Sequence, residues 1–284
     1  MRSVGLLAAL TIVALAASLC PAFAQNAAWL GRGGTGAALT NEDATGYVNP
    51  AGLARLGTDG FLVEKGDNWC GQFGYTHDAS AGVDEWVAQA SARRMGADWG
   101  ASLGYAWWDG DKEWFAGFGK AIKASGDNHG WYAGILLWDS KYHTNIGGRT
   151  VARDTVGEDV GVQYATQMDI LGFPSTVSLG AVLVDLTDEF QRYVNAGIGL
   201  KFSRLTLAAD FIDVTDDTEK GNTTNVGAEY KLCKYVTGRV GLQDSDLTWG
   251  ASFQKDNLAV DFGAYQPENS HWIRAVGVRY GRSF

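Results

Sequence analysis

The segment RYVNAGIGLKF, residues 192–202, shows the pattern that decides the fold. Its large apolar side chains recur at every second position: Val194, Ala196, Ile198, Leu200 and Phe202. The intervening positions from 195 to 201 carry only Asn, Gly and Lys. Because successive side chains of a strand point to opposite faces, this alternation predicts a β-strand with one apolar face and one small or polar face.

The same alternation recurs over most of the chain from Thr58 onward. The candidate strands are 58–65, 69–77, 85–94, 98–108, 113–122, 130–139, 159–167, 175–185, 192–202, 205–213, 224–232, 236–243, 247–255, 257–265 and 271–284. Single-chain bacterial barrels have an even number of strands, so one of these fifteen must be wrong or lie inside, and 58–65 is the weakest. We therefore expect fourteen strands, with twelve as the alternative.

Two architectures place such strands differently. In a soluble β-sandwich the apolar faces form a dry interior, whereas in a transmembrane β-barrel they face lipid and the small or charged faces line the lumen. The terminal strand favours the barrel, because Val276, Val278, Tyr280 and the final Phe284 share one face. We expect an all-β protein, an antiparallel transmembrane β-barrel over 58–284, which would meet the barrel-assembly machinery through the strand that ends in Phe284.

Connection lengths predict which end of the barrel faces which side. Short turns at 203–204, 233–235 and 255–256 suit the periplasmic end, and longer connections at 214–223 and 266–270 suit the outside. The longest connection is expected at 139–158, also outside.

The beginning of the chain, residues 1–24, has the features of a secretory signal peptide. Arg2 precedes an apolar run over 4–19, and Ala22-Phe23-Ala24 forms a cleavage site. A lipoprotein reading of Cys20 is disfavoured by the large Leu19 before it. No later segment has 18 consecutive apolar residues, as a transmembrane helix needs. The expected location is the bacterial outer membrane, surrounded by lipid.

The segment 25–57 is rich in Gly and Ala and has no strand pattern. Asn49 followed by Pro50 predicts a short helix from Pro50 to Arg55, since Asn is a favoured N-cap and Pro suits the first helical position. Thr40 with Asp43 predicts a second helical start. Helices this short are marginal alone, so we expect residues 25–57 to be a plug held in the barrel mouth.

Three short motifs in this segment carry a family resemblance. They are Gly33-Gly34-Thr35-Gly36-Ala37, Asn41-Glu42-Asp43-Ala44-Thr45 and Tyr47-Val48-Asn49-Pro50-Ala51-Gly52-Leu53-Ala54. They resemble the N-terminal signature of the FadL-like outer-membrane proteins, which include long-chain fatty-acid transporters and the shorter PorV-type barrels of type IX secretion. Segments 208–214, 227–230 and 239–242 are similar to the shorter members.

The resemblance implies two functions. The first is passive uptake or binding of a small hydrophobic ligand past the plug, whose motif comprises Gly33, Gly34, Gly36, Asp43, Tyr47, Asn49, Pro50, Ala51, Gly52 and Leu53. The alternative is a non-transporting PorV-like barrel that acts as a structural or protein-secretion accessory and binds a secretion partner.

Charged residues also fall on the face assigned to the lumen. They are Lys201, Asp210, Glu229, Lys231, Arg239 and Asp261. Because charges in a partly desolvated lumen should pair, we expect an ion network that stiffens the wall and anchors the plug, or a polar constriction that gates passage.

Other features point away from enzymes, cofactors and nucleic acid. The net charge of −9 disfavours nucleic acid. The G-x-G-x-x-G match at 31–36 follows no strand, so no dinucleotide cofactor is expected. The four His have no neighbour at metal-ligand spacing, and no metal or catalytic residue is predicted. Cys70 and Cys233 are expected to be unpaired.

Nine tryptophans fall near the ends of predicted strands. Aromatic belts at the two membrane interfaces would account for them, and a hydrophobic ligand channel is the alternative role for some of them. They are Trp69, Trp86, Trp99, Trp107, Trp108, Trp114, Trp131, Trp138 and Trp272.

Overall fold

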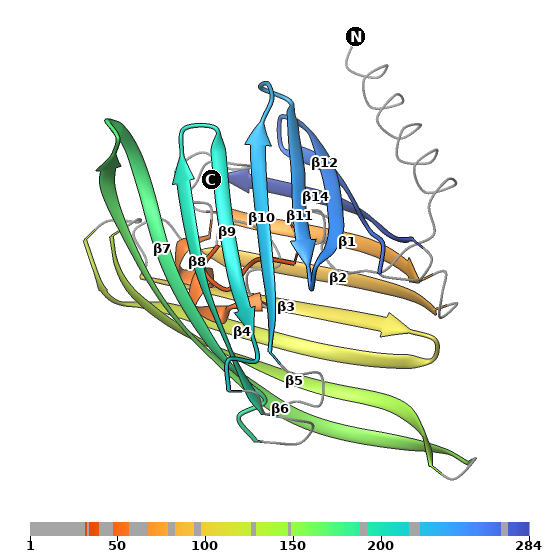
Figure 1. Cartoon of the computed structure of the whole chain (residues 1–284). Helices are drawn as coiled ribbons and strands as arrows, with labels where there is room; N and C mark the ends of the chain where they lie inside the picture. Colours follow the sequence, from red (N-terminus) through yellow and green to blue (C-terminus); the bar gives the residue numbers. More distant parts are fainter. Residues whose placement is uncertain are drawn as a thin grey trace.

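In the part of the chain that the computed structural model describes, fourteen antiparallel strands close into a barrel, in which β1 pairs with β14 (Figure 1). The described residues are 32, 34–39, 48–56, 68–78, 83–93, 98–125, 129–146, 149–187, 192–215, 222–267 and 272–283. The strands are β1 (Asn68–Asp78), β2 (Val83–Arg93), β3 (Trp99–Trp108), β4 (Asp111–Ala124), β5 (Gly130–Ile146), β6 (Arg149–Ile170), β7 (Phe173–Val184), β8 (Tyr193–Phe202), β9 (Leu205–Ile212), β10 (Thr223–Lys231), β11 (Val236–Gln243), β12 (Asp246–Lys255), β13 (Leu258–Tyr265) and β14 (Ile273–Ser283).

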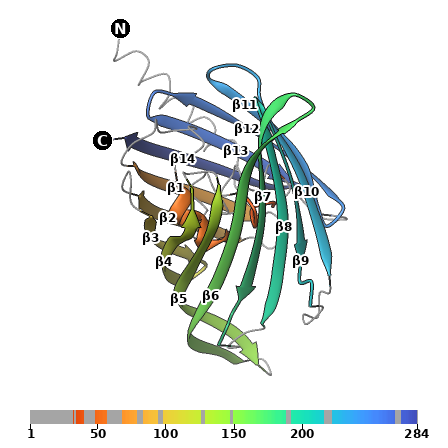
Figure 2. The same ribbon diagram turned by 90° about the vertical axis from the view of Figure 1, so that its left-hand side faces the viewer.

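The predicted fold class and the preferred number of strands are therefore confirmed. The weakest candidate strand, 58–65, lies outside the described residues, as do the leader and Phe284. Each strand pairs with the next along the chain, and β5 to β9 run side by side along one wall (Figure 2). Whether residues 25–57 and 58–284 behave as separate units remains a prediction.

The two faces of the wall alternate as predicted. On β12 the inward side chains Thr248 and Ser252 are buried, whereas the outward Leu247, Trp249 and Phe253 are exposed. The same holds for most other strands, so large apolar side chains cover the outside of the barrel. A soluble sandwich would show the reverse arrangement, with these side chains inside.

Aromatic rings gather outside near both barrel ends. We call the end that holds Asn68 and Ser283 the terminal end, and the opposite end the far end. Near the terminal end Trp69 lies against Tyr280, and Trp131 against Tyr164. Near the far end the outward rings include Tyr75, Trp86, Tyr105, Trp107, Trp114, Trp249 and Trp272. Two belts of this kind are typical of membrane barrels.

Two tryptophans do not belong to the belts. Trp138 was predicted to face the interface, but its side chain is buried on the inner face of β5, where its Nε1 donates to Asp159 Oδ1 at 3.3 Å. Trp108 has the inward parity of β3, which it shares with the buried Ser102 and Ala106. Both predictions were wrong because nearness to a strand end does not determine which face a side chain occupies.

The predicted pattern of turns is only partly correct. Two-residue turns lie at the terminal end at 171–172, 203–204 and 256–257, and longer connections lie at the far end between β9 and β10 and between β13 and β14. However, Asp109-Gly110 and Asp244-Ser245 form equally short turns at the far end. All four of these residues have positive φ, which matches the type I′ turns that suit two-residue hairpins.

The longest predicted connection, 139–158, is instead a hairpin. β5 and β6 pair continuously from Gly130↔Ala165 to Ile146↔Arg149, so only two residues connect them. The Lys141 Nζ lies 2.6 Å from Asp154 Oδ2 across the hairpin, and this hydrogen bond raises the pKa of Lys141 and lowers that of Asp154. The apolar alternation is missing here because the hairpin extends past β4 and β7, where neither face borders lipid.

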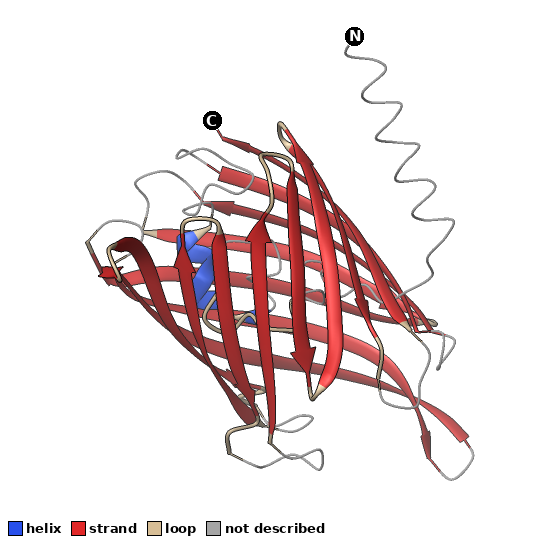
Figure 3. Ribbon diagram, turned by 45° about the horizontal axis from the view of Figure 1, so that its top comes forward, coloured by secondary structure: helices blue, strands red, loops and turns tan. Residues whose placement is uncertain are grey.

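The described N-terminal residues lie inside the barrel. The short 3₁₀ helix η1 (Pro50–Arg55) contacts β2 to β6, and all six of its residues are buried (Figure 3, blue). Its bounds are those predicted from the Asn49-Pro50 pair. No helix in the described part of the chain is long and apolar enough to span a membrane. Cys70 and Cys233 are thiols and not disulfide partners, as predicted.

Candidate functional site

The candidate site is the lumen together with the N-terminal segment inside it. Asn49 begins η1 with extended backbone angles (φ −152°, ψ 104°), and its Oδ1 accepts from Ala51 N at 3.1 Å. Its Nδ2 donates to Ala37 O at 2.6 Å and to Val162 O at 3.4 Å. One fully buried amide therefore caps the helix, joins the two described parts of the segment and attaches both to β6.

Glycines on the inner wall make room for this segment. Gly119, Gly134 and Gly161 are register partners on β4, β5 and β6. A Cβ at Gly134 would lie 2.3 Å from Pro50 C, and one at Gly161 would lie 2.1 Å from Asn49 Oδ1. Gly180 and Gly197 pair on β7 and β8, and a Cβ at Gly180 would lie 1.9 Å from Ala37 O. We call these five residues the glycine seat.

Asp210 attaches the first part of the segment to β9. Its Oδ2 accepts from Gly36 N at 2.6 Å and from Ala37 N at 2.8 Å. Gly34 precedes this contact with a φ of +70°, a conformation that glycine adopts without strain. Two adjacent backbone N–H groups on one carboxylate form a concave anion-binding arrangement, so the glycine-rich motif holds a wall carboxylate and no nucleotide need be invoked.

Alternating arginines and carboxylates continue from the segment along the wall. Arg32 Nη1 lies 3.3 Å from Glu229 Oε2, which also accepts from Arg239 Nε at 2.7 Å. Arg239 Nη1 lies 3.7 Å from Asp261 Oδ1, and Asp261 accepts from Arg279 Nη2 at 2.7 Å. Ser252 bridges Arg239 and Asp261. This arginine ladder joins the N-terminal segment to β10, β11, β12, β13 and β14.

The structure brings four of the six predicted lumen charges to the segment or the ladder. Asp210 holds the segment, and Glu229, Arg239 and Asp261 belong to the ladder. Lys201 lies on β8, separated from the ladder by β9, and Lys231 lies nearer the terminal end than Glu229 on β10. Of the predicted plug motif, Gly33, Asp43 and Tyr47 lie outside the described residues.

Sequence reasoning missed several polar partners. Arg32 and Arg55 lie in the Gly- and Ala-rich segment and are buried, and Arg55 Nη1 donates to Gln163 Oε1 at 3.0 Å. Arg279 was missed because only the apolar face of the terminal strand was considered. The signal was present, since Arg279 shares its parity with the small residues Ala275 and Gly277. Among the described residues, no group of three or more potential metal ligands occurs.

Nearer the far end than η1, a group of apolar side chains lies on the inner wall beside polar ones such as Glu85 and Asp159. Phe115, Leu136 and Trp138 pack together and are buried, with Val87 against them. The Phe115 ring occupies the space beside Gly104, and the Trp138 ring that beside Gly157. We call Val87, Phe115, Leu136 and Trp138 the inner apolar cluster. It lies one to two inward rows from the glycine seat, because Gly117 pairs with Leu136 and Gly119 with Gly134.

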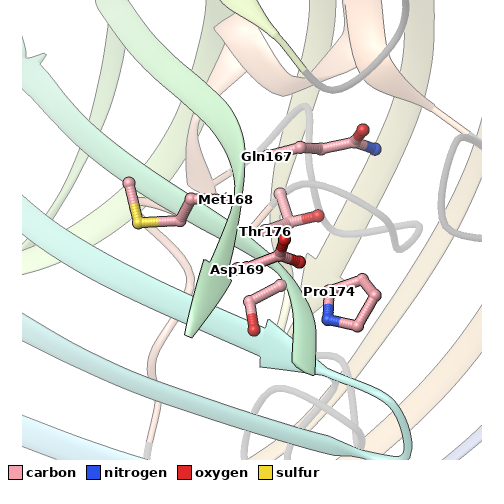
Figure 4. A pocket seen from close by; sticks show the side chains of 6 residues that line it. Gln167, Met168, Asp169, Pro174 and Thr176 are labelled. Atoms are coloured by element: carbon pink, nitrogen blue, oxygen red, sulfur yellow. The ribbon is translucent and has the colours of Figure 1, made fainter. Parts of the chain in front are cut away.

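A polar hollow lies near the terminal end of β6 and β7. It measures about 340 Å³ and is lined by Gln167, Met168, Asp169, Pro174, Ser175 and Thr176 (Figure 4). Gln167 and Met168 point in opposite directions from β6. Asp169 pairs in register with Pro174, and Thr176 with Lys201 of β8, so both charges border the terminal end of the lumen. The hollow is thus distinct from the inner apolar cluster, which lies toward the far end.

Comparisons with known proteins support the fold. No protein-family model and no curated protein sequence matches the chain. The structure is similar to the Ralstonia pickettii toluene transporter TbuX, with a TM-score of 0.58 and 12% identity over 92% of this chain and 98% of that chain. The predicted likeness to the FadL-like barrels holds for the fold. The E1M, A116K mutant of the Rh. blastica porin matches less well, with a TM-score of 0.40 and 13% identity over 76% of this chain and 99% of that one.

Replacing Asn49 by Ala should loosen η1 without unfolding the barrel. The loss of an N-cap costs about 0.5–2 kcal/mol, so the amides of Gly52 and Leu56, which donate to Asn49 O and Leu53 O, should exchange with deuterium about tenfold faster. Thr224→Ala, at an exposed position on β10, serves as the control. Equal exchange in the two variants would show that Asn49 does not hold the helix.

Proposed function

We propose that the protein is a bacterial outer-membrane barrel that takes up or binds small hydrophobic molecules passively, past its N-terminal plug. The outer-membrane placement is supported by the apolar outer surface between two aromatic belts. The fold similarity to a toluene transporter is consistent with this proposal.

The observation that carries the proposal is the inner apolar cluster. The interior of a porin-like barrel is polar and filled with water, whereas here Phe115, Leu136 and Trp138 lie on the lumen side of the wall. Apolar side chains on a lumen wall favour contact with apolar solutes, because both surfaces leave water on contact. A hydrophobic molecule entering from the far end would meet this cluster before it meets η1.

The plug accounts for the selectivity of such a route. The N-terminal segment is attached by backbone and side-chain hydrogen bonds to β6, β9 and β10. Polar solutes would have to pass a close-packed segment, whereas an apolar solute can first bind at the cluster. The plug motif and the lumen charges are thus proposed to hold the plug in place, whereas the inner apolar cluster is proposed to contact the substrate.

Leu136→Ala should increase the flux of a hydrophobic solute severalfold, because Leu136 is 1% exposed and helps to close the cluster. The matched control is Leu137→Ala, one residue along β5, whose side chain faces outward and is 50% exposed. The measurement is toluene entry into vesicles with a lipopolysaccharide outer leaflet. The proposal fails if the unmodified protein and Leu136→Ala admit toluene no faster than vesicles without protein.

One observation favours the alternative, a non-transporting barrel that serves as a structural or secretion accessory. The β5–β6 hairpin continues beyond the barrel as a two-stranded ribbon, because residues 142–146 and 149–153 have no register partner on β4 or β7. At the base of the ribbon, His143 contacts Asp111 of β4. Unpaired strand edges are suited to bind another protein. If the protein is such an accessory, shortening this ribbon should abolish crosslinking to a secretion partner and leave toluene flux unchanged. The accessory role would be contradicted if the unmodified barrel crosslinks to no protein.

A further inference from the structure

A second cavity lies on the outer surface of the barrel, away from the lumen. It measures about 350 Å³ and is lined by Trp249, Phe262, Ala264, Trp272 and Arg274. Trp249 pairs in register with Ala264, and Ala264 with Arg274, so one outward row crosses β12, β13 and β14. This row lies close to the far end, since Arg274 is the second residue of β14 and Ala264 is next to the last residue of β13.

Aromatic rings form the walls of this cavity. The ring centroids of Trp249 and Phe262 are 5.0 Å apart, and those of Trp249 and Trp272 are 6.5 Å apart with the rings nearly perpendicular. Ala264 forms the floor and is only 1% exposed although it points outward. The cavity therefore offers an apolar recess at the depth of the far-end aromatic belt, where acyl chains give way to headgroups.

Arg274 supplies a positive charge at the mouth of this recess. The inward arginines Arg32, Arg239 and Arg279 all contact carboxylates, whereas Arg274 forms no ion pair with any carboxylate of the described residues. Its register partner on β1 is His77, which is bound to Asp84 at 2.7 Å, and Asp84 also accepts from Tyr75. The carboxylate of Asp84 is thus already engaged by His77 and Tyr75.

We propose that this cavity binds a phosphate-bearing lipid of the outer leaflet, of the lipid A class. Its acyl chain packs between the indoles of Trp249 and Trp272, and its phosphate accepts hydrogen bonds from the guanidinium of Arg274. Arginine binds phosphate in a bidentate, charge-assisted manner. The occupant is a lipid because the recess is apolar and faces the membrane, which a free phosphate ion would avoid. This inference rests on the membrane placement proposed above and on an orientation with the far end outside, as the longer β9–β10 and β13–β14 connections predict, but not on transport.

The test is native mass spectrometry of the full protein released from mixed micelles that contain diphosphoryl lipid A. The unmodified protein should retain one lipid A molecule. Arg274→Gln should reduce the retained fraction about tenfold, as expected for the loss of a charge-assisted hydrogen bond, and Arg274→Lys should retain an intermediate amount. Lys120→Gln, an outward substitution near the terminal end, should leave retention unchanged.

Two further arms identify the ligand and the recess. Excess inorganic phosphate should not displace the lipid, and Trp272→Ala should weaken retention although Arg274 is intact. Equal lipid A retention by the unmodified protein and Arg274→Gln would overturn the proposal. Arg274→Gln should transport toluene normally. Lost lipid binding with unchanged toluene flux would show that this site is separate from the lumen. If the proposed transport is wrong, lipid A retention by the unmodified protein should still be observed.

Discussion

The double variant Gly134→Ala, Gly180→Ala is expected to lose the seat of the N-terminal segment. Each new methyl group would lie about 2 Å from backbone atoms of Pro50 and Ala37, a separation that nonbonded atoms cannot adopt. Because both new methyl groups would clash with backbone atoms, rotation of a side chain cannot relieve the clash. The segment must leave the wall, while the barrel strands remain paired.

Two measurements check this expectation. The amides of Gly52 and Leu56 should lose most of their protection from deuterium exchange, and the ionic conductance of the barrel in a planar bilayer should rise above that of the unmodified protein. The matched control is Gly71→Ala, Gly238→Ala, since a Cβ at either outward position meets no atom closer than 3.5 Å. If the seat variant and this control show the same exchange and conductance, the glycines do not serve the plug.

The second large effect concerns the arginine ladder. Asp261→Asn should reduce the free energy of unfolding by about 3–5 kcal/mol, because removing one partner of a buried ion pair leaves the opposite charge uncompensated. Asp261 is 1% exposed and lies between Arg239 and Arg279, so both cations are affected. Urea unfolding of the protein in lipid vesicles measures the change.

An exposed ion pair provides the control. Asp98 lies 3.6 Å from Lys120, and both side chains are more than half exposed. Asp98→Asn should therefore change the free energy of unfolding by about 0–1 kcal/mol. Losses of equal size for Asp98→Asn and Asp261→Asn would mean that the ladder is solvated and contributes little to the barrel.

The barrel itself was predictable from the sequence because its main constraint is local. A lipid-facing wall requires an apolar side chain at every second position, and β8 and β12 show this pattern without interruption. The β5–β6 ribbon was not predicted, because the strands were recognised by their lipid-facing alternation. Where a hairpin leaves the lipid, Lys141 and Asp154 can occupy outward positions and the pattern disappears.

The site was less predictable because its contacts join residues far apart in the chain. The N-cap role of Asn49 could be predicted from its neighbour Pro50, but its bond to Ala37 could not. The alternation placed Glu229 and Asp261 in the lumen, yet it gave no information on which arginine each would meet. The inner apolar cluster was invisible, since Trp138 belongs to the inward face of a strand whose outward face is also apolar.

The central claim is that every second side chain of the wall faces lipid. Nitroxide labels placed singly at 247–254 along β12, in protein reconstituted into vesicles, test it most directly. We predict high accessibility to oxygen and low accessibility to a water-soluble nickel complex at 247, 249, 251 and 253, and loss of this oxygen contact at 248, 250 and 252. A protein that is soluble without detergent, with labels at 249 and 253 shielded from both reagents, would contradict the account.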